Sequence, residues 1–452
     1  MAKNLVRLNI IVFISLVLIN LLGVFMPELG FDALWYHLTL SKLFLLKHQW
    51  YFPGGLYYYS AMPRLAELIG LPLLALFGYI GPKFVQFFSG LATSYLIYRL
   101  AQKFTHDKLL SLVAVNLFYG TWLVSWQSSS AYVDLVRTLF ELLGLYFLAA
   151  EKLTLKRVVS AGIFLGLAIG VKWHALGTLL LLTLIFTPLI VPIALLVASP
   201  WFLIAYHFTG NPLHPLLEKF MTQTQLAQVS PTFFAPLSIL YRFITAPIFL
   251  TRPMEDFLSP VAGIIYLLAL PCLLSSNKVI RKMSLFGILG TFLLELTPPP
   301  STRYFLPYFP ALVIASTYFL SRLKRNIALW PVALFTTSAF LIFGLRLSAF
   351  AKYWPYLTGK QTLNHFLASQ SYRLPDTFID ADDYVKNNLS PNASYAITNL
   401  HNLFYFPYNF DHDSFVDNNK HYDYLVTKNT PAHDVEGDLI HINPIGIQIF
   451  KL

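Results

Sequence analysis

The sequence predicts an all-α polytopic membrane protein with about eleven transmembrane helices and a small C-terminal α/β domain. Of its 452 residues, 56% are hydrophobic and only 12% are charged, whereas a soluble domain carries roughly 25% charged residues. Apolar runs of spanning length recur up to residue 345. After residue 376 the chain is polar, and its short alternating runs are typical of β-strands.

The predicted spans alternate between the two faces of a membrane. Short basic loops collect on one face, around Arg99, Lys152, Lys278 and Arg322. Because such loops are typically cytoplasmic, we expect a multi-pass protein of the plasma membrane with its N-terminus inside and no cleaved signal peptide. The predicted spans are residues 8–26, 84–100, 109–126, 135–150, 158–172, 175–190, 191–206, 259–276, 284–297, 304–320 and 328–345.

This orientation leaves three larger segments outside the membrane. The first outer loop, 27–83, contains two apolar runs at 33–47 and 65–80 that are too short or too interrupted to span. We expect both to be helices lying in the membrane interface. The second large outer loop is 207–258.

The third outer segment is the tail, 346–452, which is long enough for a small α/β domain. Strands are predicted near 395–397, 424–426 and 447–450.

Charge and cysteine content exclude several other classes. The net charge of +10 does not indicate nucleic-acid binding, because the basic residues lie between spans, where membrane topology places them. Cys272 is the single cysteine, so neither a disulfide within the chain nor a metal site built on thiolates is possible.

Ionisable residues gather at the outer ends of the spans. Because charge is costly at membrane depth, such a cluster is a candidate functional site, and its carboxylates and cations suit a reacting hydroxyl with either an anion or a divalent metal ion. The candidate residues are Asp32, Tyr36, His37, Asp134, Lys172, His174, Glu295 and Arg303.

Each of these residues also has a purely structural interpretation. Asp32 and Asp134 are both placed to cap the helices that follow them. Lys172 and Arg303 are placed to extend from span ends toward the interface. It is their predicted location on one membrane face that favours a shared site.

Several stretches resemble the GT-C glycosyltransferases, in particular the protein O-mannosyltransferase and lipid A aminoarabinose transferase types. Their order along residues 1–320 is the main signal. The stretches are Asp32-Ala33-Leu34-Trp35-Tyr36-His37-Leu38, Ala131-Tyr132-Val133-Asp134, Gly166-Leu167-Ala168-Ile169-Gly170-Val171-Lys172-Trp173, Ser199-Pro200-Trp201-Phe202 with Thr209-Gly210-Asn211-Pro212-Leu213-His214-Pro215, and Arg303-Tyr304-Phe305-Leu306-Pro307.

The resemblance implies a catalytic membrane domain over 1–345 that transfers sugar from a polyprenyl-phosphate donor to a hydroxyl on a lipid, glycan or protein. Asp32 would be the general base, and Asp134 would assist it or hold a divalent metal ion with it. Lys172 and Arg303 would bind the donor phosphate. Tyr36, His37, His174 and Glu295 remain candidates for substrate contact.

Two other functions fit the composition. A transporter or flippase would also place charges in membrane segments, although typically near their middle. In this sequence the main charges inside a span are Arg137 and Glu141, whose spacing of four residues favours a helical ion pair. A non-catalytic scaffold would use the tail to bind a partner and would have no cleft beneath it.

Overall fold

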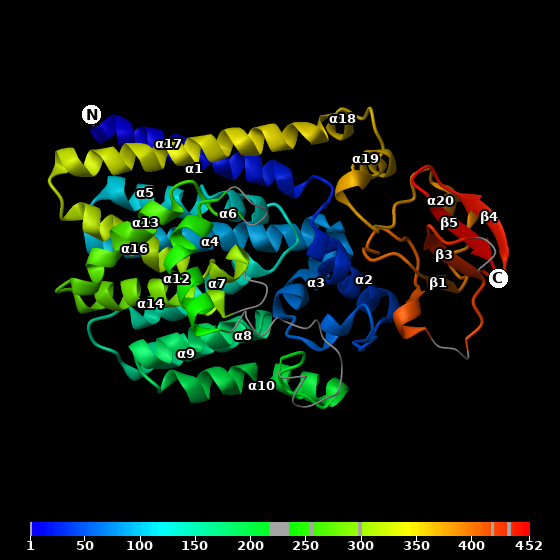
Figure 1. The fold of residues 1–452 in the computed structure, drawn as a ribbon, viewed down its shortest axis with the longest axis horizontal. Coiled ribbons are helices and arrows are strands. Elements are labelled where there is room, and N and C mark those ends of the chain that lie inside the picture. Colours follow the sequence, from blue (N-terminus) through cyan, green and yellow to red (C-terminus); the bar gives the residue numbers. More distant parts are fainter. Residues whose placement is uncertain (1, 217–234, 253–256, 297–300, 417–419, 432–434) are drawn as a thin grey trace.

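The computed structural model describes residues 2–452 except 217–234, 253–256, 297–300, 417–419 and 432–434; the side chains of residues 2, 294 and 295 are also outside the description. A bundle of helices occupies one end of the molecule and a small sheet the other, with the helices of the first outer loop between them (Figure 1). The N-terminus and the basic turn at 322–325 lie at the end of the bundle away from the sheet.

Every predicted span corresponds to one helix or to a pair of consecutive helices. The helices of the bundle are α1 (Ala2–Val24), α4 (Ile80–Thr105), α5 (Lys108–Tyr119), α6 (Trp122–Gln127), α7 (Asp134–Leu148), α8 (Leu155–Val171), α9 (Ala175–Ile185), α10 (Ile190–Thr209), α12 (Pro236–Phe249), α13 (Ala262–Ala269), α14 (Lys278–Glu295), α15 (Thr302–Phe305), α16 (Phe309–Ser321) and α17 (Arg325–Phe350).

Length and composition separate these helices into two groups. Among the described residues, three helical segments are long and apolar enough to cross a membrane: Lys3–Val24, Ile190–Thr209 and Arg325–Leu357. The remaining apolar helices are shorter, so the count of eleven spans stays a prediction.

The third predicted span, 109–126, is broken into α5 and α6 at Gly120 and Thr121. Thr121 caps α6, since its side chain accepts a hydrogen bond from the amide of Val124. A Cβ at position 120 would lie 2.8 Å from the Cβ of Ala339 in α17, so only glycine allows this close approach.

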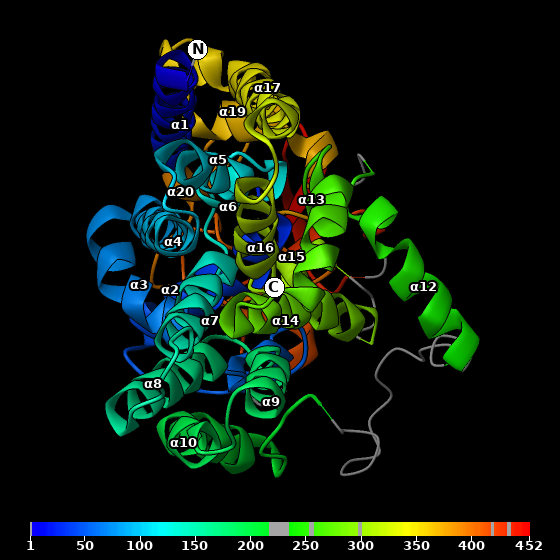
Figure 2. The same ribbon diagram turned by 90° about the vertical axis from the view of Figure 1, so that its left-hand side faces the viewer.

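The second large outer loop, 207–258, contains a helix, α12, that was not predicted. Pro236 begins the helix, a position where its missing amide proton costs nothing. The apolar side chains of Leu237, Ile244 and Ile248 are exposed, and the helix lies at the periphery of the bundle (Figure 2). Parts of the predicted loop, 217–234 and 253–256, lie outside the described residues.

Both apolar runs of the first outer loop are helical. The first run forms a π-helical turn, Ala33–His37, followed by α2 (Leu38–Lys47), and the second forms α3 (Leu65–Phe77). Lys42 of α2 donates hydrogen bonds to the backbone oxygens of Phe404 and Phe406 in the tail. That these two helices lie in the membrane interface remains a prediction.

The tail begins after α17 and continues through α18 (Trp354–Leu357), α19 (Leu363–Ser369) and α20 (Tyr384–Asn388). Within its described residues it forms a five-stranded mixed sheet in the order β2-β1-β3-β5-β4. The strands are β1 (Tyr395–Ile397), β2 (Asp411–His412), β3 (Tyr424–Lys428), β4 (Asp438–Ile442) and β5 (Ile447–Lys451). Strands β1, β3 and β5 coincide with the predicted ones, whereas β2 and β4 were not predicted.

The sheet and the first outer loop share one hydrophobic core. Leu43 and Phe44 of α2 pack in the same cluster as Ile397, Val426 and Ile449 of the sheet. The tail is therefore attached to the loop that carries Asp32 by buried apolar surface, which is the main favourable term in such packing.

Candidate active site

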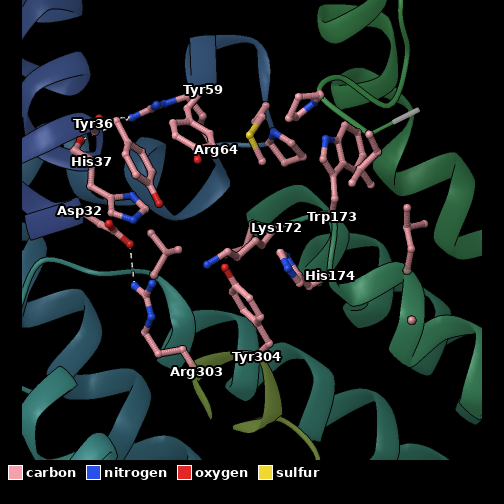
Figure 3. Close-up of a pocket in the computed structure, with 18 of the residues that line it drawn as sticks. Asp32, Tyr36, His37, Tyr59, Arg64, Lys172, Trp173, His174, Arg303 and Tyr304 are labelled. Atoms are coloured by element: carbon pink, nitrogen blue, oxygen red, sulfur yellow. Dashed lines mark hydrogen bonds and ion pairs between the residues drawn. The ribbon is translucent and has the colours of Figure 1, made fainter. Parts of the chain in front are cut away.

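The predicted site residues surround a cavity of about 670 Å³ between the bundle and the first outer loop. Its charged and aromatic walls come mainly from the first outer loop with α3, the connection between α8 and α9, and α15 (Figure 3). Other segments also line it, among them Val133, Pro215, Leu216, Leu293, Leu296 and Tyr308. The predicted residues that line it are Asp32, Tyr36, His37, Lys172, His174 and Arg303.

Asp32 and Arg303 form an ion pair at the edge of this cavity. The Nη1 atom of Arg303 lies 2.6 Å from Oδ2 of Asp32, and each side chain is less than one-fifth exposed, at 17% and 18%. Asp32 has helical backbone angles and makes no capping hydrogen bond with its side chain. Its carboxylate is thus directed toward Arg303 and does not cap the following helix.

The electrostatics of this pair strongly favour a charged arginine. Burial lowers the pKa of Arg303, but the carboxylates of Asp32 and Asp134 together raise that pKa well above its ordinary value. The guanidinium also lies 5.1 Å from the ring centre of Tyr132, within the range of a cation–π contact.

Asp134 and Lys172 form a second ion pair, with 3.2 Å between Oδ1 and Nζ. Asp134 is fully buried and also accepts a hydrogen bond from Gln127. It is the first residue of α7 and does not cap it. Lys172 is 11% exposed and reaches the cavity, whereas Asp134 is not among the lining residues and lies behind Lys172.

Aromatic rings complete the walls near the two cations. His174 stacks on Tyr304, with 4.1 Å between ring centres, and Nζ of Lys172 lies 5.0 Å from the same tyrosine ring. Tyr36 packs against Tyr59. Burial, then the negative charge of Asp32, raises the pKa of Tyr36 well above its ordinary value, so this hydroxyl stays protonated. The side chain of Glu295 lies outside the described residues.

The surroundings of Asp32 and Asp134 do not fit a divalent metal ion bound between these two carboxylates. Each of these carboxylates is already ion-paired with a cation, and a metal ion would have to compete with Arg303 and Lys172. In the described part of the chain, no group of three or more His, Cys, Asp or Glu residues is placed to hold a metal.

Arg137 and Glu141 form the ion pair that their spacing predicts, with 3.1 Å between Nε and Oε1. Both side chains are 1% exposed. Thr178 bridges Glu141 to Tyr308, whose ring lines the cavity. Through Tyr308, this buried network is connected to the cavity wall.

Glu28 is a structural residue of the site that sequence reasoning missed. Its Oε1 accepts hydrogen bonds from the Gly30 amide at 2.7 Å and the Ser130 hydroxyl at 3.0 Å. Its Oε2 accepts one from the Ala131 amide at 2.8 Å. This buried carboxylate joins the segment before Asp32 to the segment before Asp134, because Ser130 and Ala131 are about one hundred residues away in the sequence.

A second cavity of about 390 Å³ also borders on the Asp32–Arg303 pair. Asp32 and Arg303 line both cavities. The second one also has several further cations in its walls, namely Lys83, Arg346, Lys352 and Arg373. The ion pair therefore lies where two differently lined spaces meet.

No family model matches the sequence, and no curated protein matches it either. Solved structures do match. ArnT from Cupriavidus metallidurans in the apo state superposes with a TM-score of 0.67 at 14% identity, covering 99% of this chain and 98% of that one. The same protein bound to undecaprenyl phosphate gives a TM-score of 0.67 at 13% identity, covering 98% and 97%.

A more distant match is the oligosaccharyltransferase from Archaeoglobus fulgidus in complex with Zn and sulfate, with a TM-score of 0.53 at 12% identity. It covers 93% of this chain and 68% of that one. These matches confirm, at the level of the fold, the resemblance predicted from the sequence: over nearly its whole length the chain has the GT-C glycosyltransferase fold.

Proposed function

We propose that this protein is a membrane glycosyltransferase that moves a sugar from a polyprenyl-phosphate donor to a hydroxyl acceptor at the outer face of the membrane. The observation that carries the proposal is the Asp32–Arg303 ion pair at the meeting point of two cavities. A transferase must bring two substrates to one reacting centre, and this pair supplies a carboxylate base and a cation there.

The larger cavity suits the donor. Its walls combine apolar and aromatic side chains with Lys172 and Arg303, and cations of this kind bind phosphate oxygens. Asp134 holds Lys172 in place from behind. The structure of ArnT with undecaprenyl phosphate supports a lipid phosphate as the donor group.

The smaller cavity suits the acceptor, because Asp32 also lines it and a hydroxyl bound there could reach the carboxylate. In the transfer, the acceptor hydroxyl loses its proton to the Asp32 carboxylate while its oxygen bonds to the anomeric carbon. The bond from that carbon to the phosphate breaks, and the lipid phosphate leaves with the electron pair. Arg303 and Lys172 stabilise the charge that develops on it.

The proposal is tested with the purified full-length protein and a panel of radiolabelled undecaprenyl-phosphate sugars, with a membrane extract as the source of acceptors. We expect label to move to an acceptor and undecaprenyl phosphate to form, with Lys172→Ala and Arg303→Ala raising KM for the donor. Failure of transfer from every donor, combined with donor translocation across liposomes, would instead indicate the flippase alternative.

A further inference from the structure

Asp32, Tyr36 and His37 all reach the large cavity because the chain here forms a π-helical turn. The amide of Leu38 bonds to the oxygen of Ala33, five residues earlier. In an α-helix, residues five apart point about 140° away from each other. With i→i+5 bonding they complete about one turn, and such turns are frequent at functional sites. Figure 3 draws Asp32 and His37 on the same wall.

The imidazole of His37 is held in one orientation from behind. Its Nδ1 lies 2.7 Å from Oε1 of Glu67, and Nη2 of Arg64 lies 3.4 Å from the same oxygen. Burial raises the pKa of Glu67, but Arg64 and the hydrogen bond from His37 outweigh it and hold this pKa below its ordinary value. An ionised carboxylate only accepts hydrogen bonds, so the neutral imidazole carries its proton on Nδ1.

The other ring nitrogen of His37 is unused. Nε2 is buried and has no hydrogen-bond partner among the described residues, although the side chain lines the cavity and is only about 5% exposed. With Nδ1 protonated, Nε2 presents a lone pair. A buried carboxylate–imidazole pair with a free acceptor nitrogen is the arrangement by which enzymes orient a basic histidine.

We propose that His37, oriented by Glu67, receives from Asp32 the proton that the acceptor hydroxyl gives up. This inference rests on the proposed function. The proton passes from the acceptor oxygen to the Asp32 carboxylate and then to Nε2 of His37. The transfer regenerates ionised Asp32 and leaves an imidazolium beside ionised Glu67.

The charges around the two groups favour this direction of transfer. A protonated Asp32 would leave the Arg303 guanidinium without its counter-charge, and an unpaired charge in a largely buried site is unfavourable. An imidazolium at His37 would instead face the Glu67 carboxylate. Among the described residues, the rings of Tyr36 and Tyr132 also pack against His37. Arg64 contacts both Glu67 and the backbone oxygen of His37. Glu67 is thus a positioning residue in this scheme.

The test compares pH profiles of sugar transfer for the parent, His37→Gln and Glu67→Gln, using the undecaprenyl-phosphate sugar that the parent protein uses. Loss of a proton acceptor costs roughly 100-fold or more in rate, so His37→Gln should lower kcat by about that factor, keep KM, and lose the acid limb of the profile. In Glu67→Gln the acid limb should move to lower pH, because the protonated imidazole loses the carboxylate that faces it.

His401→Gln is the matched control. His401 stacks on Phe31 and lies against Trp35 of the same loop, but it does not line either cavity. It should keep the profile of the parent. Nitrogen-15 NMR of histidine-labelled protein adds a readout that needs no activity: the resonance absent from His37→Gln should show a proton on Nδ1.

Two results would overturn the inference: an acid limb and kcat unchanged in both variants, or a proton on Nε2 of His37. In that case a parent that transfers sugar normally would leave the proposed function standing. A parent that transfers sugar from no donor would refute the proposed function, and the role of His37 with it.

Discussion

Asp32, the base in the proposed mechanism, lies in a site that is largely removed from water. The carboxylate pairs with Arg303, whose opposite charge offsets part of the cost of removing it from water. The same cation is then available to a donor phosphate. At the scale of single residues, the site consists of two ion pairs, Asp32–Arg303 and Asp134–Lys172. In the proposed function, the cations of both pairs bind the donor phosphate.

Asp32→Asn should abolish transfer with little effect on folding. The Oδ1 atom of asparagine can still accept the hydrogen bond from Arg303, but it cannot take a proton, so the rate should fall roughly 100- to 10,000-fold. Donor binding should persist, since Lys172 and Arg303 remain. Initial rates and binding of radiolabelled donor measure the two effects separately.

Asp438→Asn is the control for that change, because Asp438 is exposed on β4 and lines neither cavity. It should behave like the parent protein. Near-normal turnover of Asp32→Asn would remove Asp32 as the base.

Glu28→Gln should weaken both stability and transfer. Both carboxylate oxygens of Glu28 accept hydrogen bonds, so either orientation of the glutamine amide places an N–H group against another donor. A buried group left unsatisfied costs about 1–3 kcal/mol. Thermal unfolding in detergent should show this loss.

The exposed Glu436 offers a matched control, since Glu436→Gln removes the same charge away from the segments that Glu28 joins. A Glu28→Gln protein with the thermal stability of the parent would contradict the structural role given to this carboxylate.

The sequence pointed to charged residues at or near the ends of predicted spans, such as Asp32, Lys172 and Arg303. Sequence reasoning missed Glu28, Arg64 and Glu67, because their roles depend on partners that the fold supplies. Glu28 acts through Ser130 and Ala131, which only the packed structure brings near. The sequence also predicted one shared site for Asp32, Asp134, Lys172 and Arg303, whereas Asp134 does not line the cavity and is buried against Lys172.

At the scale of elements, hydropathy located the helices but not their breaks or their faces. Gly120 interrupts an apolar run that is otherwise continuous, so the change from α5 to α6 leaves no trace in a hydropathy profile. Helix α12 was missed for the opposite reason, since Arg242 and Pro247 interrupt its apolar sequence.

The small residues of α8 form a close contact with α10, as their four-residue spacing predicts. A Cβ at Gly166 would lie 2.6 Å from the oxygen of Ala194 and from the Cβ of Val197. Gly166→Ala should therefore separate the helices and destabilise the fold by about 1–3 kcal/mol, the usual cost of overpacking. The melting temperature in detergent measures this effect.

Gly344→Ala supplies the comparison within α17, where nothing lies within 4 Å of the added Cβ. Alanine is favoured over glycine in a helix by about 1 kcal/mol, so this variant should be as stable as the parent or more stable. Equal melting temperatures for the two variants would argue against close packing of α8 and α10.

At the scale of the whole molecule, the tail and the first outer loop pack against each other. They share a hydrophobic core, and Lys42 binds backbone oxygens of the tail. The tail also contacts the segment before Asp32, where the hydroxyl of Tyr405 donates a hydrogen bond to the backbone oxygen of Glu28. Both must therefore lie on the same face of the membrane.

This shared face gives the topology a sharp test. The basic turn 322–325 lies at the same end of the molecule as the N-terminus, away from the tail (Figure 1). Because basic loops are retained in the cytoplasm, reporter fusions after residues 105, 155 and 325 should report inside, and a fusion after 370 should report outside. The site would then open to the outer face, where a lipid-linked donor and an external acceptor can meet. A cytoplasmic signal at 370 would reverse the orientation of the tail, and with it the side from which both cavities receive their substrates.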